Sequence, residues 1–184
     1  DYVSLPNSIN MGTSDFTLSI WLKTDDTGSR QHVFQQTGSN DNRVIAINSG
    51  GSLTSRLGGS GSDHVSEVTL STDTWYHIAL VHDNSANTLK WYVNGKEQNT
   101  NTSVNVPANT GTFYLGTNSN ANDKYFNGQI DEVRIWNDVR TAAEIADNKD
   151  DELAGNESGL VAYYKMSDGT GTTLTDNSSD SNNG

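Results

Sequence analysis

The sequence contains no cysteine in its 184 residues and only two prolines. The absence of cysteine excludes a disulfide framework and a thiol nucleophile. A chain of this length buries a substantial core without cross-links. All-β sandwiches often reach about 200 residues as one unit. We therefore expect a single domain over residues 1–184, in which the polar segment 170–184 is a loop or the start of a linker.

Long apolar runs and basic residues are also scarce. No stretch approaches the roughly 18 apolar residues of a membrane-spanning helix, so we expect no membrane insertion. The chain carries 11 Lys and Arg against 23 Asp and Glu, a net charge of −12. Such a surface repels nucleic acid and anionic membranes, which excludes both as expected partners. The chain starts at Asp1 without a leader pattern, so we interpret it as a segment of a longer protein.

The apolar residues fall in short bursts that alternate with period two. Phe16, Leu18, Ile20 and Leu22 share one side of a strand, whereas Trp21 lies on the other side. About a dozen such bursts indicate an all-β, two-sheet antiparallel β-sandwich or jelly roll. The expected strands are 2–5, 16–23, 32–35, 43–47, 53–57, 65–70, 75–82, 89–93, 113–115, 130–136 and 160–166.

Two local motifs define a turn and a helix. Asn94-Gly95 is the dipeptide preferred in a two-residue type I′ hairpin turn, where both residues need φ above zero. Thr141 and Glu144 form a capping-box pattern, which predicts one short helix near 141–148. The tail 170–184 is almost wholly polar, so we expect order there only if a ligand or metal organises it.

Four segments then occur in an order typical of a known family. Together they resemble the laminin-G-like and pentraxin-like modules of the concanavalin A-like jelly-roll superfamily, particularly bacterial laminin-G modules. The resemblance implies two antiparallel sheets, frequent Ca²⁺ binding, and recognition of glycans or matrix proteins. The segments are Phe16-Thr-Leu-Ser-Ile-Trp-Leu-Lys23, Trp75-Tyr-His-Ile-Ala-Leu-Val-His82, Trp91-Tyr-Val-Asn-Gly95 and Phe126-Asn-Gly-Gln-Ile-Asp-Glu-Val-Arg-Ile-Trp136.

The resemblance implies binding residues in two loops. Asp41-Asn42 aligns with a calcium-ligating pair of pentraxins, and the loop after Leu115-Gly116 replaces most family acids with neutral oxygens. Since Ca²⁺ affinity falls with carboxylate count, one ion or a direct glycan site fits this loop equally well. Loops 36–43 and 117–126 supply the expected ligand-binding residues Asn40, Asp41, Asn42, Asn118, Asn120, Asp123 and Tyr125.

The tail offers a second potential metal site. Oxygen side chains at alternate positions, including Asp176 and Asp180, can converge on one cation. Related bacterial modules place such a loop near the Gly-x-Ile-Asp-Glu strand, which would add Asp131. The expected calcium ligands are therefore Asp41, Asn42, Asp131, Asp176 and Asp180, and the alternative for the tail is a flexible linker.

Catalytic and aromatic residues give weaker signals. Asp131 and Glu132 are adjacent, so on a regular strand they face opposite sides and form no glycosidase dyad. Trp21, Trp75 and Trp91 lie in apolar strand patterns and are expected in the core. Tyr125 is the better candidate for an exposed binding aromatic.

We therefore expect a non-catalytic, calcium-dependent carbohydrate-binding or adhesive module. It would be a monomeric, lectin-like part of a larger secreted or cell-surface protein, with a glycan or matrix ligand. The alternative is a structural spacer or protein–protein module in which calcium only stabilises loops. A third hypothesis is a polysaccharide-degrading enzyme, since the fold alone does not determine function.

Overall fold

The computed structural model describes residues 2–6, 9, 14–37, 43–57, 63–107, 111–118 and 124–184. Within these ranges the chain forms strands and one helix. In chain order they are β1 (Val3–Leu5), β2 (Phe16–Thr24), β3 (Gln31–Gln36), β4 (Arg43–Ile47), β5 (Ser52–Leu57), β6 (His64–Thr69), β7 (Trp75–Asp83), β8 (Thr88–Val93), β9 (Lys96–Thr102), β10 (Phe113–Leu115), β11 (Gly128–Trp136), α1 (Ala142–Asn148) and β12 (Leu160–Tyr164).

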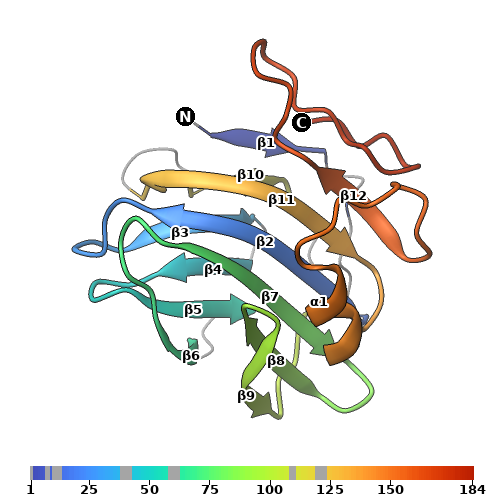
Figure 1. Ribbon diagram of the computed structural model, residues 1–184. Helices are drawn as coiled ribbons and strands as arrows, with labels where there is room; N and C mark the ends of the chain where they lie inside the picture. Colours follow the sequence, from blue (N-terminus) through green and yellow to red (C-terminus); the bar gives the residue numbers. More distant parts are fainter. Residues whose placement is uncertain are drawn as a thin grey trace.

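The strands form two six-stranded antiparallel sheets stacked face to face (Figure 1). Sheet A has the order β1-β10-β3-β4-β5-β6, and sheet B has the order β12-β11-β2-β7-β8-β9. The sandwich expected from the sequence is therefore confirmed. Its sheets combine strands far apart in sequence, as β11 pairs with β2 and β10 pairs with both β1 and β3.

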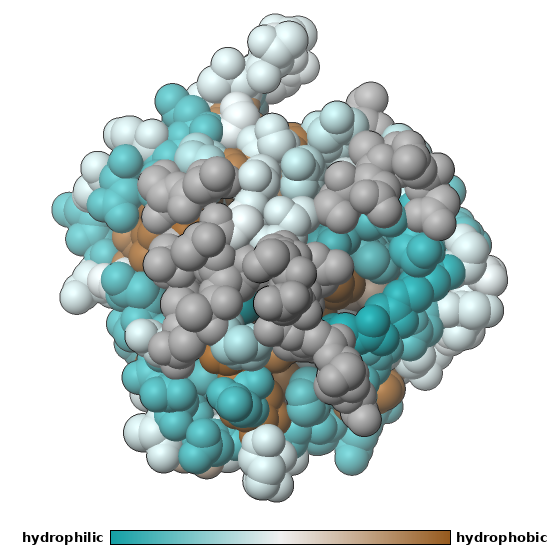
Figure 2. Space-filling model, turned by 180° about the vertical axis from the view of Figure 1, so that it is seen from behind, coloured by the Kyte–Doolittle hydropathy of each residue, from teal (hydrophilic) through white to brown (hydrophobic). Residues whose placement is uncertain are grey.

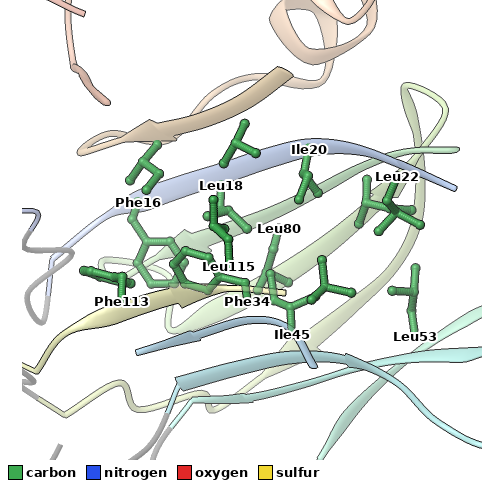
Figure 3. Packing of buried hydrophobic residues seen from close by; sticks show 14 of the residues in the cluster. Phe16, Leu18, Ile20, Leu22, Phe34, Ile45, Leu53, Leu80, Phe113 and Leu115 are labelled. Carbon is green, nitrogen blue, oxygen red and sulfur yellow. The ribbon is translucent and has the colours of Figure 1, made fainter. Parts of the chain in front are cut away.

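The core lies between the sheets. On β2 the period-two pattern points Leu18, Ile20 and Leu22 inward, where each is at most 2% exposed. They face side chains of sheet A such as Phe34 and Ile45 (Figure 3). Burying one large aliphatic or aromatic side chain stabilises the fold by about 1.5–3 kcal/mol. Many such contacts explain how the chain folds without disulfides.

The hairpin of β8 and β9 is only partly predictable from the sequence. Asn94 has φ 51° and Gly95 has φ 77°, as a type I′ turn requires. The sequence analysis assigned no strand to β9, because its residues, KEQNTNT, are polar throughout. β9 forms an edge of sheet B and pairs with β8, which explains how a strand without an apolar face is held.

The predicted helix and its capping box are both present in α1. The Thr141 side chain accepts a hydrogen bond from the Glu144 N–H, and the Glu144 carboxylate accepts one from the Thr141 N–H. Ile145 packs on Ala79 and Val81, which point outward from sheet B. The helix thus covers part of the outer face of sheet B (Figure 1).

The polar tail packs on the sandwich through protein hydrogen bonds, which the sequence analysis did not foresee. Asp176 is 7% exposed, and its carboxylate accepts from the N–H groups of Tyr163, Ser178 and Asn182 and from the Ser178 hydroxyl, at 2.6–2.8 Å. The Tyr164 hydroxyl donates to the Asn182 carbonyl. The buried Asp176 carboxylate therefore orders the tail. The sequence analysis had expected a bound ligand or metal to be needed for this.

One face of the molecule shows how polar and apolar residues are distributed on the surface. On the face turned away from α1, the visible described residues are mainly hydrophilic, with hydrophobic ones in small separate areas (Figure 2). No helix within the described residues is long and apolar enough to cross a membrane.

Candidate functional site

An open hollow of about 370 Å³ lies on the outer face of sheet B. Trp21 of β2 and Trp75 of β7 supply its aromatic surface. Asp131 and Glu132 of β11, together with Asp150 from the segment after α1, supply its polar groups. Three neighbouring strands and one connector therefore build the site.

Strand register explains why the two indole rings are together outside the core. Trp21 pairs with His77 on one side and Asp131 on the other, and Lys23, two residues along β2, pairs with Trp75. Residues two apart share a face, so Trp21 and Trp75 both lie opposite the inward row that includes Ile20. The expectation of a core position was wrong for Trp75, which is 40% exposed, and for Trp21, which is half-buried on the outer face.

The other tryptophans behave differently. Trp91 is completely buried between the sheets, as expected. Trp136 is also buried, in a cluster with Leu153, Leu160 and Tyr163. In the hollow, by contrast, the Trp21 Nε1–H donates to the Lys149 carbonyl at 2.7 Å, and the ring contacts His77 edge to face. Trp21 is therefore fixed in orientation, while Trp75 presents its ring to solvent.

A β-bulge brings the two adjacent acids to the same hollow. Asp131 lies opposite Trp21 and Arg134 lies opposite Ser19, so β11 contains one more residue than β2 over this stretch. Glu132 lies in this bulge with φ 49°, a left-handed conformation that is uncommon for a non-glycine residue. The expectation that Asp131 and Glu132 face opposite sides was wrong, because the bulge breaks the period-two alternation on which it relied.

The two carboxylates have different surroundings. Glu132 accepts hydrogen bonds from Arg134 Nη2 at 2.6 Å and from the Tyr163 hydroxyl at 2.7 Å. Arg134 is itself 3% exposed and also donates to the carbonyls of Asn148 and Asp151. Glu132 is therefore held in one position by a buried network.

Asp131 is less compensated. Its Oδ1 accepts from the Glu132 N–H at 2.9 Å, and it has no ion-pair partner among the described residues. Burial raises the pKa of Asp131, and the negative charges of Glu132 and Glu152 add to that rise. Beneath Trp21, burial and the charges of Arg134 and Lys149 lower the pKa of His77 to about 4, so His77 is neutral at neutral pH.

The hollow combines flat apolar rings with acceptor-only carboxylates. Ionised carboxylates accept hydrogen bonds from hydroxyl or amino groups, and indole faces pack against flat apolar surfaces. The site therefore suits a ligand with an apolar face edged by several hydrogen-bond donors.

The loop residues expected to bind a ligand are mostly outside the described residues, namely Asn40, Asp41, Asn42, Asn120 and Asp123. The described parts of these loops are anchored at opposite ends of β3. Arg43 Nη1 donates to Gln36 Oε1 at 3.1 Å at one end, and the His32 N–H donates to the Lys124 carbonyl at the other. Asn118 is buried, whereas Tyr125 is 44% exposed.

The metal ligands expected in the tail are not brought together with a third acid. Within the described ranges no group of three or more His, Asp or Glu residues could hold a metal ion. A carboxylate offers about four lone-pair positions. Four protein donors fill them at Asp176, and Asp180 is exposed. Asp131 lines the hollow instead of joining Asp176 and Asp180.

The signal for part of this site was present in the sequence. Trp21 alternates out of the Leu18, Ile20, Leu22 row, so its outward direction could be inferred from strand period alone. The position of Trp75 depends on its pairing with Lys23, and the grouping of acids depends on the bulge. Neither of these two features has a local sequence signature.

Comparisons with known proteins agree with this architecture. The profile of the Laminin_G_3 family, described as the concanavalin A-like lectin/glucanases superfamily, matches residues 1–146. No curated protein sequence matches the chain. In all, 288 solved chains are similar to this one, and three of them illustrate the range.

A Bacteroides ovatus protein provisionally described as carbohydrate-binding has 23% identity and a TM-score of 0.81, over 99% of this chain and 54% of its own. The present chain therefore spans about half of that protein. The CBM40 module of the Ruminococcus gnavus IT-sialidase, solved with α2,3-sialyllactose, has 16% identity and a TM-score of 0.63, over 74% and 83% of the two chains.

A heptameric SAP-like pentraxin from Limulus polyphemus has 16% identity and a TM-score of 0.61, over 79% of this chain and 73% of its own. Identities this low show a shared fold. The family profile covers most of the sequence, and the sandwich it implies is the one observed. The chain belongs to the concanavalin A-like lectin/glucanases superfamily.

Proposed function

We propose that this chain is a non-catalytic carbohydrate-binding module and that the hollow is its glycan site. The observation that carries the proposal is the exposed ring of Trp75 beside Trp21 and the carboxylates of β11. A sugar ring has an apolar face of C–H groups and an edge of hydroxyl donors. The indole rings suit the face, and Asp131 and Glu132 suit the edge.

The relatives support this proposal by their descriptions. The R. gnavus module was solved with a sialylated trisaccharide, and the B. ovatus protein is provisionally described as carbohydrate-binding. The similar structures also include a domain of an enzyme, an extracellular arabinanase of Geobacillus stearothermophilus. The described hollow offers acids for binding, and Glu132 is tied to Arg134 and Tyr163 in a fixed position. We therefore favour binding over catalysis.

Calcium, location and context form a further part of the proposal. We assign any Ca²⁺ to the loop containing Asp41 and Asn42, on the family resemblance and on the oxygen ligands that Ca²⁺ prefers. We place the module in a larger secreted or cell-surface protein, with an adhesive role. In this view Ca²⁺ stiffens a loop, while the hollow on sheet B binds sugar without it.

A glycan array of the purified chain tests the proposal, with Trp75→Ala and Tyr125→Ala as matched variants. Both residues are exposed aromatics, at 40% and 44%, but only Trp75 lines the hollow. We expect specific glycan signals that Trp75→Ala abolishes and Tyr125→Ala leaves unchanged, with or without a chelator.

The opposite pattern would place the glycan on the loop of Tyr125, and a chelator-sensitive signal would make calcium part of recognition. An array without any specific signal would contradict glycan binding. It would favour the structural spacer or protein–protein module.

A further inference from the structure

The charged side chains that line the hollow all have the same sign. They are the carboxylates of Asp131, Glu132 and Asp150. Glu132 is paired with Arg134, and Asp150 is paired with Lys149. Asp131 has no ion-pair partner among the described residues, which leaves one uncompensated negative charge beside Trp21.

No other described charged group forms an ion pair with Asp131. Lys23, two residues from Trp21 on β2, has its ammonium 5.8 Å from the centre of the Trp75 ring. Glu152 is paired with Lys165, and His77 is neutral at neutral pH. The contact of Lys23 also shows that the face of Trp75 accommodates an ammonium group through a cation–π interaction.

We infer that the hollow selects sugars that carry a free primary amine, with glucosamine oligomers as the type, over N-acetylated and acidic sugars. This inference rests on the proposed function, because it assumes that the sugar ring packs on Trp75 and Trp21. The ammonium group donates to the Asp131 carboxylate. A charge-assisted hydrogen bond of this kind is about twice as strong as a neutral one.

The same geometry disfavours two other classes of sugar. N-acetylation removes the positive charge and leaves a neutral amide opposite Asp131. Uronic and sialic acids place a carboxylate against three lining carboxylates, in a protein whose net charge is already −12. Like charges at one site repel, so binding of acidic sugars is opposed.

Binding of the amine depends on pH through Asp131. Burial and the nearby acids Glu132 and Glu152 raise the pKa of Asp131. Affinity for the amino sugar therefore falls as the pH decreases through that raised pKa and Asp131 takes up a proton. At high pH it falls again when the sugar amine loses its own proton.

Calorimetric titration with the tetramers of glucosamine and N-acetylglucosamine tests the inference. The variants are Asp131→Asn, Trp75→Ala and, as a charge-matched control, Glu67→Gln, since Glu67 is exposed on β6 of the opposite sheet. We expect wild type to prefer the amino tetramer roughly tenfold, a difference of about 1.4 kcal/mol. Asp131→Asn should remove the preference, Glu67→Gln should retain it, and Trp75→Ala should weaken both sugars.

Two results overturn the inference in different ways. Equal binding of the two tetramers, weakened by Trp75→Ala, leaves the proposed function intact and refutes selection of the amine. Amine binding that survives Trp75→Ala shows general attraction to an acidic surface and refutes stacking in the hollow. Absence of binding to both tetramers refutes the amino-sugar inference, while the glycan array decides the proposed function separately.

Discussion

Three acidic residues show how strongly surroundings decide the role of a carboxylate. Asp131 and Glu132 are neighbours, yet Glu132 is fixed by Arg134 and Tyr163 while Asp131 faces the hollow without a counter-charge among the described residues. Asp176 is buried under four donors, although the sequence suggested a metal ligand.

Replacement of Asp131 by Asn should change stability in a pH-dependent way. Because the pKa of Asp131 is raised in the folded state, protonation favours folding, and that contribution is lost as the pH rises from 3.8 through the raised value. Asn removes the ionised carboxylate and keeps an acceptor for the Glu132 N–H. The midpoint of thermal unfolding should therefore rise in the variant at pH 7 and match wild type near pH 3. A lower midpoint at pH 7 would contradict this assignment.

Replacement of Asp176 by Ala should destabilise the fold strongly. The change leaves the buried N–H groups of Tyr163, Ser178 and Asn182 without their acceptor. Each unsatisfied buried group costs about 1–3 kcal/mol, so we expect a total loss of roughly 3 kcal/mol or more in urea unfolding. Asp180→Ala is the matched control and should change stability little, with or without Ca²⁺. A calcium-induced stabilisation lost in both variants would restore the tail as a metal site.

At the scale of elements, regular alternation was predictable from the sequence and its interruptions were not. The period-two row of β2, the apolar burst of β7 and the capping box of α1 depend on local sequence, and they were predicted with nearly correct bounds. β9 lacks an apolar row and exists because β8 pairs with it. The bulge at Glu132 arises from pairing with β2, so its effect on Asp131 could not be inferred from β11 alone.

Loss of the capping box should weaken α1. Thr141→Ala removes the acceptor of the Glu144 N–H, and removal of such a cap costs about 1 kcal/mol. Because Ile145 packs on the outer face of sheet B, we expect this loss to appear in the global free energy of unfolding in urea. Thr141→Ser keeps the acceptor and should stay close to wild type. Equal destabilisation by Ser and Ala would show that the cap is not the cause.

The turn before β9 is packed against α1. Comparison of Gly95 with Gly169 separates the cost of backbone strain from the cost of a steric contact with the helix. Gly95 has φ 77°, and a Cβ there would lie 3.1 Å from Ala146 Cα, whereas Gly169 has φ 72° with open space around it. Both Gly→Ala changes impose backbone strain of about 1 kcal/mol. Only Gly95→Ala adds a contact with the helix, so it should be the more destabilising in urea. Equal losses of unfolding free energy in the two variants would show that α1 moves away from the added Cβ without an energetic cost.

At the scale of the molecule, the sandwich brings together residues that are distant in sequence. β2, β7 and β11 become neighbours in sheet B, and the connector after α1 completes the hollow. The family and the two sheets follow from the sequence. The strand period of β2 also contains the outward direction of Trp21, although the sequence analysis placed that residue in the core. The exposure of Trp75 and the grouping of Asp131 with Glu132 depend on long-range register, which explains why the sequence directed attention to the loops instead.

The most direct test of the account is a ¹H–¹⁵N titration that follows the four tryptophan indole N–H signals, one from each of Trp21, Trp75, Trp91 and Trp136. The probes are tetramers of glucosamine, N-acetylglucosamine and glucose. We predict saturable shifts at Trp21 and Trp75, largest with the glucosamine tetramer, while the buried Trp91 and Trp136 serve as internal references. Saturable glycan binding that leaves the signals of Trp21 and Trp75 unmoved would contradict the assignment of the hollow as the sugar site.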